Sequence, residues 1–332
     1  MKMVFVSWDR FHRRSELLAD HLGAALHTIH VGQSGRMWQA PARYALQTLQ
    51  TWRVLGRERP EVILVQNPPI FAALAVYLYA RFSAARFAID SHTGAFIGRR
   101  WRWSVRLHRY LSRRADVTIV HNTAQEAIVR NWGCVYRVIG FTPGNYPDTG
   151  AYSLPDGFTV AVISTFKEDE PLDTVFEAAH RLPDVAFFFT GNSRRIPARL
   201  RAQQPPNCHL TGYLPYNAYV ALLRGAGVIM DLTTRDETLL MGGFEAISLG
   251  TPLITSNWPV LKDYFHAGTV HVASTVEGIC AGVRRAQTEN AALRAGMRQL
   301  RDELTADWQR RLAELKSLLE STSQAANSEA RT

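Results

Sequence analysis

Short apolar runs alternate with segments of helical period along most of the chain. In the first half, the apolar runs predict strands at residues 3–7, 26–30, 62–66, 86–90 and 117–121. The segments between them predict helices at 15–22, 44–57, 70–82, 99–113 and 124–132. Apolar strands that alternate with helices indicate a parallel sheet covered on both faces.

Residues 140–157 are rich in glycine and proline and predict a linker. The alternation then starts again, with strands at 159–164, 186–190, 228–231, 253–255 and 270–272. Helices are predicted at 172–181, 216–224, 244–249 and 276–287, followed by a long helix over 290–319. We therefore expect an α/β protein with two Rossmann-like, doubly wound domains facing a central cleft. Ligands of such sheets bind beyond the carboxyl ends of the strands.

The composition agrees with this picture. A chain of 332 residues is too long for one compact core and favours two domains. The longest apolar run, residues 70–80, is too short to span a bilayer, and the first ten residues read as a strand rather than a signal peptide. The scattered cysteines Cys134, Cys208 and Cys280 form no metal or disulfide pattern, which favours a reducing cytoplasm.

Charge is distributed unevenly between the two halves. Residues 1–150 carry 20 Lys and Arg against 9 Asp and Glu, whereas the remainder carries 18 against 20. The net charge of +9 therefore belongs to the first half. We expect that half to meet an anionic partner, such as a membrane surface, a phosphate-bearing acceptor or nucleic acid.

The segment 231–265 carries the most specific chemistry. Glu237 and Glu245 are separated by seven residues, and Gly242 and Gly243 lie just before the second glutamate, near the start of a short predicted helix. Glycines leave room for a ligand to approach the backbone, and a helix start favours a phosphate. The arrangement suits a sugar joined to a diphosphate. In the alternative interpretation, Glu245 only complements the helix dipole and Glu237 is solvated.

This segment resembles the retaining glycosyltransferases of the GT-B fold, specifically family 4 and its relatives. The family marker is a carboxylate, seven residues, Glu-Ala, a Gly-Thr-Pro turn and a strand. It reads here as Glu237, Glu245, Ala246, Gly250, Thr251 and Pro252. The stretch LDTVFEAAHRLPDVAFFFTGN also resembles the first helix and second strand of the family's nucleotide domain. The resemblance is strongest over residues 159–265.

The resemblance implies roles for particular residues. Glu245 is expected to bind the ribose, and Glu237 and His92 are the catalytic candidates, because the family has a carboxylate and often a histidine facing the transferred sugar. Backbone N–H groups around residues 241–244, at Gly242, Gly243 and Phe244, are expected to hold the sugar and the diphosphate. Tyr213 and Leu214 are expected to lie against the nucleobase.

The chain departs from the family where the diphosphate is neutralised. The family supplies an arginine and, five residues later, a lysine, but those positions hold Thr165 and Glu170 here. Lys167 lies in the same loop and is a substitute, with Thr165 donating hydrogen bonds. The glycine-rich loop after the first strand is also missing. The cationic candidates in its place, as phosphate or acceptor contacts, are Arg10, Arg13 and Arg14.

Two of these candidates have simpler interpretations. His92 follows a predicted strand, and a histidine there often bonds only to its own loop. Lys167 is a surface lysine unless its loop folds inward. Asp90 either orients a neighbour or caps the next helix.

The predicted helix 99–113 carries a basic stripe. Its arginines recur at helical spacing and are flanked by aromatic residues, with no acid among them. Arginine with interfacial aromatics is typical of an anionic membrane surface. The alternatives are an exposed basic helix or one paired with acids elsewhere, and no nucleic-acid motif accompanies the stripe. Its members are Arg99, Arg102, Trp103, Arg106, Arg109 and Arg113.

The resemblance implies two domains with different tasks. Residues 1–145, joined by the final helix at about 305–322, are expected to bind the acceptor, and residues 155–300 the nucleotide-sugar. The implied enzyme is cytoplasmic and peripheral on the inner face of the membrane. It would transfer a sugar from a nucleotide-diphosphate-sugar, with retention of configuration, to a lipid-linked or glycan acceptor in cell-surface polysaccharide or glycolipid synthesis.

No metal or cofactor is expected, and no nucleic-acid partner. One alternative is a non-catalytic GT-B relative that serves as a partner subunit or regulator of another transferase, which the missing cationic pair favours. A GT-B epimerase or phosphorylase shares the frame, but the sequence holds no motif that supports it. The sequence leaves the oligomeric state, the base and the sugar open.

Overall fold

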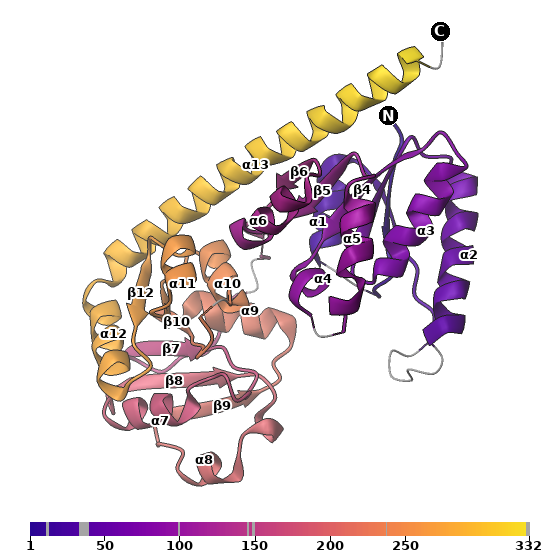
Figure 1. The fold of residues 1–332 in the computed structure, drawn as a ribbon. Helices are drawn as coiled ribbons and strands as arrows, with labels where there is room; N and C mark the ends of the chain where they lie inside the picture. The colour runs from indigo at the N-terminus through magenta and orange to yellow at the C-terminus, as the bar shows by residue number, and fades with distance from the viewer. Residues whose placement is uncertain are drawn as a thin grey trace. The chain divides into compact units, whose positions relative to one another are not determined.

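The computed structural model describes residues 1–10, 13–32, 40–98, 100–144, 146–147, 150–236 and 238–329, without the side chains of residues 13, 97 and 322–329. The chain forms two compact units (Figure 1). Unit 1 comprises Met1–Phe141 and Asp307–Thr332, and unit 2 comprises Thr142–Ala306. Each unit contains a six-stranded sheet in which every paired neighbour is parallel.

The sheet of unit 1 has the strand order β2-β1-β3-β4-β5-β6. Its strands are β1 (Met3–Ser7), β2 (Ala25–Thr28), β3 (Val62–Asn67), β4 (Arg86–Ser91), β5 (Val117–Val120) and β6 (Tyr136–Val138). Its helices are α1 (Arg13–Leu22), α2 (Ala40–Glu58), α3 (Ile70–Arg81), α4 (Thr93–Ile97), the 3-10 helix η2 (Arg102–Ser104), α5 (Val105–Ser112) and α6 (Thr123–Trp132). The order reverses between β1 and β3, which is the position where ligands bind in such sheets.

The sheet of unit 2 has the order β12-β11-β10-β7-β8-β9 and reverses between β7 and β10. Its strands are β7 (Phe158–Val162), β8 (Val185–Thr190), β9 (Cys208–Gly212), β10 (Val228–Asp231), β11 (Leu253–Ser256) and β12 (Thr269–Val272). Its helices are α7 (Leu172–His180), η3 (Ser193–Arg195), α8 (Ala198–Ala202), α9 (Tyr216–Gly225), α10 (Met241–Leu249), α11 (Pro259–Tyr264) and α12 (Val276–Thr288).

Apolar side chains on both faces of the unit 1 sheet form two separate cores. Val4 and Val6 of β1 pack in one core with residues of α2 and α3. Phe5 points the other way and packs in a second core with Leu18 of α1. Successive strand residues face opposite sides of a sheet, so a continuous apolar run is buried on both faces of the sheet.

The last helix, α13 (Asn290–Glu329), begins in unit 2 and belongs to unit 1 from Asp307 onward. Apolar side chains of α13 pack in the second core of unit 1. In addition, Arg86 of β4 donates a hydrogen bond of 2.7 Å to the carbonyl of Leu319. The core residues that α13 supplies are Trp308, Leu312, Leu315 and Leu319.

The two parallel α/β sheets confirm the predicted fold class, and each predicted strand is present. Two edge strands, β6 and β9, were not predicted, because their sequences YRV and CHLTG lack the apolar runs that mark the inner strands. The single helix predicted over 99–113 is wrong. The segment contains η2 followed directly by an α5 of eight residues, and Ser104, at the end of η2, donates a hydrogen bond to the carbonyl of Trp101. No helix among the described residues is long and apolar enough to cross a bilayer.

Candidate functional site

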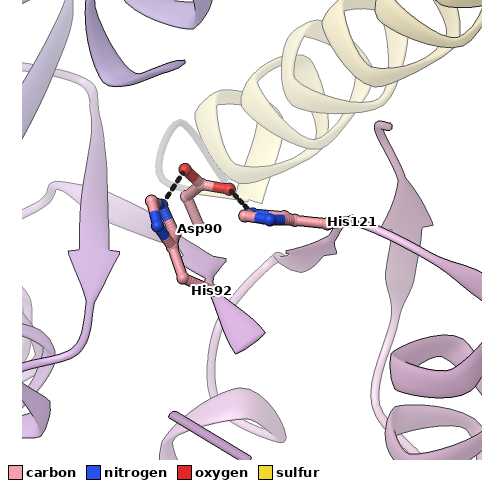
Figure 2. A group of neighbouring side chains, drawn as sticks. All are labelled: Asp90, His92 and His121. Carbon is pink, nitrogen blue, oxygen red and sulfur yellow. Dashed lines mark hydrogen bonds and ion pairs between the residues drawn. The ribbon is translucent and has the colours of Figure 1, made fainter. Parts of the chain in front are cut away.

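Two histidines meet a buried aspartate at the carboxyl edge of the unit 1 sheet (Figure 2). Asp90 lies next to the last residue of β4 with its side chain fully buried, His92 follows two residues later, and His121 follows β5. Nε2 of His92 lies 3.0 Å from Oδ2 of Asp90, and Nε2 of His121 lies 3.4 Å from Oδ1. The two imidazole rings are 4.6 Å apart and meet edge to face. Adjacent parallel strands therefore deliver all three groups to one place.

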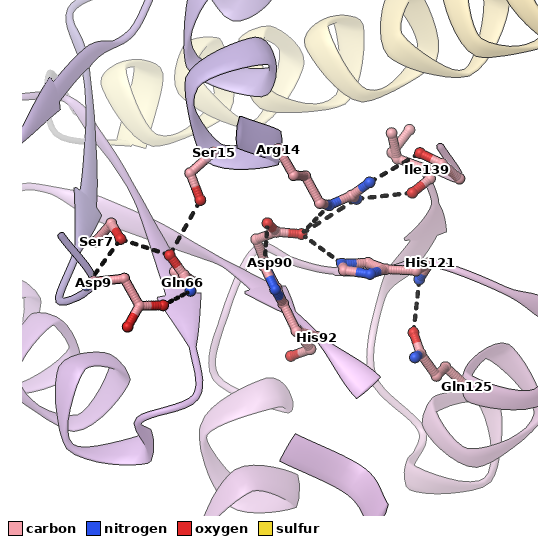
Figure 3. Close-up of polar contacts among 12 residues, drawn as sticks. Ser7, Asp9, Arg14, Ser15, Gln66, Asp90, His92, His121, Gln125 and Ile139 are labelled. Atoms are coloured by element: carbon pink, nitrogen blue, oxygen red, sulfur yellow. Dashed lines mark hydrogen bonds and ion pairs between the residues drawn. The ribbon is translucent and has the colours of Figure 1, made fainter. Parts of the chain in front are cut away.

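Arg14 of α1 closes this cluster (Figure 3). Its guanidinium lies 3.4 Å from Oδ1 of Asp90 and donates to the carbonyls of Ile139 and Gly140 at 2.8 and 2.9 Å. Arg14 is predicted as a phosphate or acceptor contact, and in the structure four of its five N–H groups point to three internal acceptors. Arg10 is exposed, whereas the side chain of Arg13 lies outside the described residues.

Burial and the neighbouring charges together determine which groups of this cluster are ionised. Burial opposes ionisation of Asp90, but Arg14 and the imidazoles outweigh it, so the pKa of this carboxyl lies well below its usual value. Burial, with help from Arg14, lowers the pKa of His121 to about 4. Near pH 7 the cluster thus combines a carboxylate with a neutral His121.

A second polar network lies at the reversal point of the same sheet (Figure 3). Gln66 lies next to the last residue of β3 and accepts hydrogen bonds from Ser7 at 2.6 Å and Ser15 at 3.1 Å. Its amide donates to Asp9 at 2.6 Å. Asp9 lies where the resemblance leads us to expect a glycine-rich loop, and its carboxylate is instead hydrogen-bonded to Gln66.

In unit 2, Asp231 ends β10 at the reversal point of the sheet. Its Oδ2 accepts a hydrogen bond of 2.8 Å from the backbone of Gly242, at the start of α10. Burial, and then the nearby carboxylates of Glu245 and Glu170, raise the pKa of Asp231 to about 7, against the lowering effect of the Gly242 amide. One of the helix-start amides expected to hold a ligand is therefore bound to Asp231.

Close packing explains why two positions of α10 are glycine. A Cβ on Gly242 would lie 2.4 Å from the Asp231 carboxylate, and one on Gly243 would lie 2.4 Å from the ring of Phe265. Phe244 is itself buried, with its ring 5.6 Å from that of Phe265. Protein side chains therefore fill the room that the glycine pair was expected to leave for a ligand.

Glu245 faces Tyr219 of α9. The Tyr219 hydroxyl donates a hydrogen bond of 2.6 Å to Oε2 of Glu245. Burial raises the pKa of the Glu245 carboxyl, whereas the bond from Tyr219 acts in the opposite direction. A carboxylate fixed by a phenol can still accept hydrogen bonds, because each of its oxygens has two lone pairs.

The loop between β7 and α7 folds around Glu170. The backbone amides of Thr165 and Phe166 donate to the Glu170 carboxylate at 2.9 and 3.0 Å, and the Thr165 hydroxyl donates at 2.5 Å. The Ser164 hydroxyl donates to the same carboxylate. Phe166 has a φ of 56°, which turns consecutive amides toward one anion. Thr165 and Glu170, the two positions where the resemblance implies cations, are therefore hydrogen-bonded to each other.

The remaining unit 2 candidates are more exposed. Lys167 and Thr165 are exposed in the β7–α7 loop, Tyr213 is 89% exposed, and Leu214 is half-buried. Glu237, a catalytic candidate, lies outside the described residues. Before it, the backbone amide of Thr234 donates to the carbonyl of Asp169 at 2.8 Å, which joins the loop after β10 to the loop after β7.

The basic stripe is exposed on unit 1. Arg102 lies on η2, Arg106 and Arg109 lie on α5, and Arg113 caps α5, whereas Arg99 lies outside the described residues. Within the described part of the chain, none of these four arginines has an ion-pair partner. Trp103 is 63% exposed, with its ring tilted against that of Phe71 at 5.9 Å, and the hydroxyls of Tyr110 and Tyr77 are hydrogen-bonded.

Sequence reasoning missed three members of these sites. They are Asp231, His121 and Tyr219. Asp231 and His121 stand at or just after strand ends, whereas Tyr219 is one helical turn into α9. The strand-end positions carried a usable signal, because polar residues there converge at one edge of a parallel sheet. The contact between Tyr219 and Glu245 joins two helices and had no such signal.

Comparisons with known proteins agree with this architecture. A family model described as "Glycosyl transferase-like" matches residues 173–317. No curated protein matches the chain. The fold resembles that of a sucrose-phosphate synthase from Thermosynechococcus elongatus, with a TM-score of 0.71, 13% identity, and coverage of 98% of this chain and 100% of that one.

Two further solved structures are similar. HepE of Anabaena in complex with UDP-glucose has a TM-score of 0.66 at 11% identity, over 96% of this chain and 100% of its own. A putative UDP-N-acetylglucosamine 2-epimerase from Listeria monocytogenes has a TM-score of 0.64 at 14% identity, over 97% and 98%. The structural neighbours confirm the predicted fold, and the family model over residues 173–317 agrees with the predicted glycosyltransferase class.

Beside the aspartate cluster, His108 of α5 is fully buried between Phe96 and Trp132, and its Nε2 lies 2.8 Å from the Ser91 hydroxyl. Burial lowers the pKa of His108 to about 3. The unfolded chain therefore binds a proton below about pH 6.5 that the folded chain refuses, so acid favours unfolding.

We predict that the free energy of unfolding falls as the pH drops from 6.5 toward 4. The His108→Gln variant should reduce the slope by up to about 1.4 kcal/mol per pH unit, because it removes one of the linked protons. Urea unfolding at pH 7, 6 and 5 measures this, with the exposed His180→Gln as control. Parallel curves for His108→Gln and the native chain would contradict the prediction.

Proposed function

We propose that the chain transfers a sugar from a nucleotide-diphosphate-sugar bound at the carboxyl edge of the unit 2 sheet. The observation that carries this is Glu245, which is mostly buried and fixed by Tyr219 on the helix that follows the reversal point of the sheet. A fixed carboxylate at such a point suits two adjacent ribose hydroxyls. The UDP and UDP-glucose complexes of HepE, which shares the fold, support this donor class.

The diphosphate of such a donor would meet an unusual charge environment. Asp231, Glu245 and Glu170 influence one another electrostatically, and Glu170 occupies the amides and hydroxyls of the β7–α7 loop. Lys167 is the cation that this loop offers. We infer that donor binding works against Glu170, either by displacing its carboxylate from the loop or by placing the phosphates beside it.

Unit 1 is proposed to bind the acceptor. Its share of the chain carries the positive charge, which suits a phosphate-bearing or lipid-linked glycan in cell-surface polysaccharide or glycolipid synthesis. His92 at the sheet edge is the candidate to face the reacting groups. We also propose that the exposed arginines of η2 and α5, with Trp103 and Tyr110, hold the enzyme to the anionic inner face of a membrane.

One observation favours a second candidate function. Glu170 stands where relatives place a cation, which agrees with a non-catalytic relative that serves another transferase. Turnover separates the two, because a regulator would bind a nucleotide-sugar without releasing the nucleoside diphosphate. Thermal-shift measurements with UDP, GDP, ADP and their glucose conjugates would first identify the nucleotide, since a ligand of the folded state raises its stability.

We predict that Glu245→Ala weakens binding of the nucleotide-sugar by at least about tenfold, because it removes charge-assisted hydrogen bonds of roughly 1.5–3 kcal/mol. Isothermal titration of the native and variant chains with the sugar that the thermal-shift panel selects measures this. Glu177→Ala, at an exposed position of α7, is the control. Equal affinities for native chain and Glu245→Ala would sink the assignment of the donor site.

Replacement of Glu170 should act in the opposite direction. Glu170→Gln removes a negative charge beside the proposed diphosphate position, and we expect affinity for the nucleoside diphosphate to rise about three- to tenfold, as for roughly 1 kcal/mol of relieved repulsion. Glu168→Gln removes the same charge from an exposed position in the same loop and should have less effect. Weaker or unchanged binding by Glu170→Gln would show that the carboxylate does not oppose the donor.

The membrane proposal predicts a loss of vesicle binding on charge reversal. Changing Arg102, Arg106 and Arg109 together to glutamate should weaken binding to phosphatidylglycerol vesicles by about 100-fold or more, at about 1 kcal/mol for each cation lost. Sedimentation with vesicles measures the bound fraction. A control makes the same charge change at Arg194, Arg195 and Arg298, which are exposed on unit 2. Equal loss in both triple variants would mean that net charge alone, rather than this surface, attracts the chain.

A further inference from the structure

The contact between Tyr219 and Glu245 joins two neighbouring helices of unit 2. Tyr219 lies one helical turn into α9, and Glu245 lies one helical turn into α10. The Tyr219 hydroxyl donates to Oε2 of Glu245 at 2.6 Å, a length typical of a hydrogen bond to an ionised carboxylate. The carboxylate is therefore held from the side of α9, and its rotation is restricted.

Other hydrogen bonds hold the two helices independently of this contact. The backbone amide of Gly242, at the start of α10, donates to Asp231 at the end of β10 at 2.8 Å. Just beyond the end of α10, the buried hydroxyl of Thr251 donates to the carbonyl of Leu223 in α9 at 3.1 Å. Loss of the tyrosine hydroxyl alone should therefore change the carboxylate rather than the positions of the helices.

The direction of the hydrogen bond follows from its surroundings. Burial, and then the carboxylate of Glu245, hold the pKa of the Tyr219 hydroxyl above its ordinary value. The phenol thus keeps its proton near neutral pH and acts as a donor, not as a base. The same bond opposes the burial that raises the pKa of Glu245, so it favours the ionised carboxylate.

The second oxygen of this carboxylate remains open. Among the residues that the structure describes, no group donates a hydrogen bond to Oε1 of Glu245, and this oxygen is not closed off from solvent. Each carboxylate oxygen has two lone pairs, so both of those on Oε1 and one of those on Oε2 are unused. Two adjacent hydroxyls of one ligand can therefore donate to this carboxylate while Tyr219 holds it.

We propose that Tyr219 makes the donor site select ribose over deoxyribose, because it orients the Glu245 carboxylate toward both ribose hydroxyls. This deepens the proposed function and rests on it. Tyr219 is a positioning residue, since it acts on the ligand through Glu245. A site built to bind a hydroxyl strongly rejects an analogue that lacks it, because the protein group is left unpaired. A carboxylate that is free to rotate would turn to the remaining hydroxyl or to water and reject the analogue less.

The test compares ribose with deoxyribose in otherwise identical ligands. Isothermal titration measures the affinities for UDP and its 2′-deoxy and 3′-deoxy forms, or for the GDP or ADP set if the thermal-shift panel selects that base. In the native chain, each deoxy form should bind about tenfold more weakly or worse, as expected for a lost hydrogen bond to a charged group. In Tyr219→Phe, which keeps the ring, this difference should shrink to about threefold or less. Tyr216→Phe, at a position of α9 that is 58% exposed, is the control and should keep the native selectivity.

A double variant separates positioning from a general structural effect. If Tyr219 acts through Glu245, adding Tyr219→Phe to Glu245→Ala should change the affinity for the nucleoside diphosphate by less than about twofold. This double variant lacks the carboxylate that the tyrosine would leave without a donor, so its folding does not depend on their hydrogen bond. A further loss of about fivefold or more would overturn the proposal, because independent effects add in free energy.

The remaining outcomes distinguish this proposal from the proposed function. Native selectivity in Tyr219→Phe, together with weakened binding in Glu245→Ala, would overturn the role of Tyr219 and leave the donor site in place. Equal binding of ribose and deoxyribose forms by the native chain would also overturn that role. Failure of the native chain to bind UDP, GDP or ADP, or equal binding by Glu245→Ala, would count against the donor site itself and so against both.

Discussion

The buried carboxylate of Asp90 is the interaction on which unit 1 most depends. Arg14 binds this carboxylate and also the two carbonyls that follow β6, so one guanidinium joins α1, β4 and the end of the sheet. A charge buried without a partner costs several kcal/mol, and removing one partner of such a pair is strongly destabilising. The same carboxylate orients the imidazoles at the sheet edge. The stability of unit 1 and the orientation of His92 therefore depend on the same carboxylate.

Unit 2 presents the opposite electrostatic problem. Its reversal point holds carboxylates from Asp231, Glu245 and Glu170, and the structure meets their cost with amides and hydroxyls rather than with cations. Hydrogen bonds from a helix start and a turned loop can hold an anion, but here they already hold protein carboxylates. An anionic donor would have to compete for these groups or bring a cation from elsewhere.

The inner strands could be predicted from the sequence because they are buried on both faces and appear as continuous apolar runs. The edge strands β6 and β9 and the short helices could not, since they bury little and their residues resemble those of loops. Glu245 was found through the family marker. Its partner Tyr219, and the match of Thr165 with Glu170, depend on contacts between elements that no local pattern encodes. The packing role of the glycine pair could not be seen in the sequence, because packing and ligand approach demand the same residue.

The continuity of α13 limits how this protein can be divided. Residues 1–141 alone would lack Trp308, Leu312, Leu315 and Leu319, and would expose the core that contains Phe5 and Leu18. A separately expressed first unit must therefore carry the segment from Asp307 onward, joined by a linker or by circular permutation. Because α13 contributes side chains to both cores, detachment of α13 from one unit would destabilise the other. We therefore expect the unfolding of the two units to be coupled.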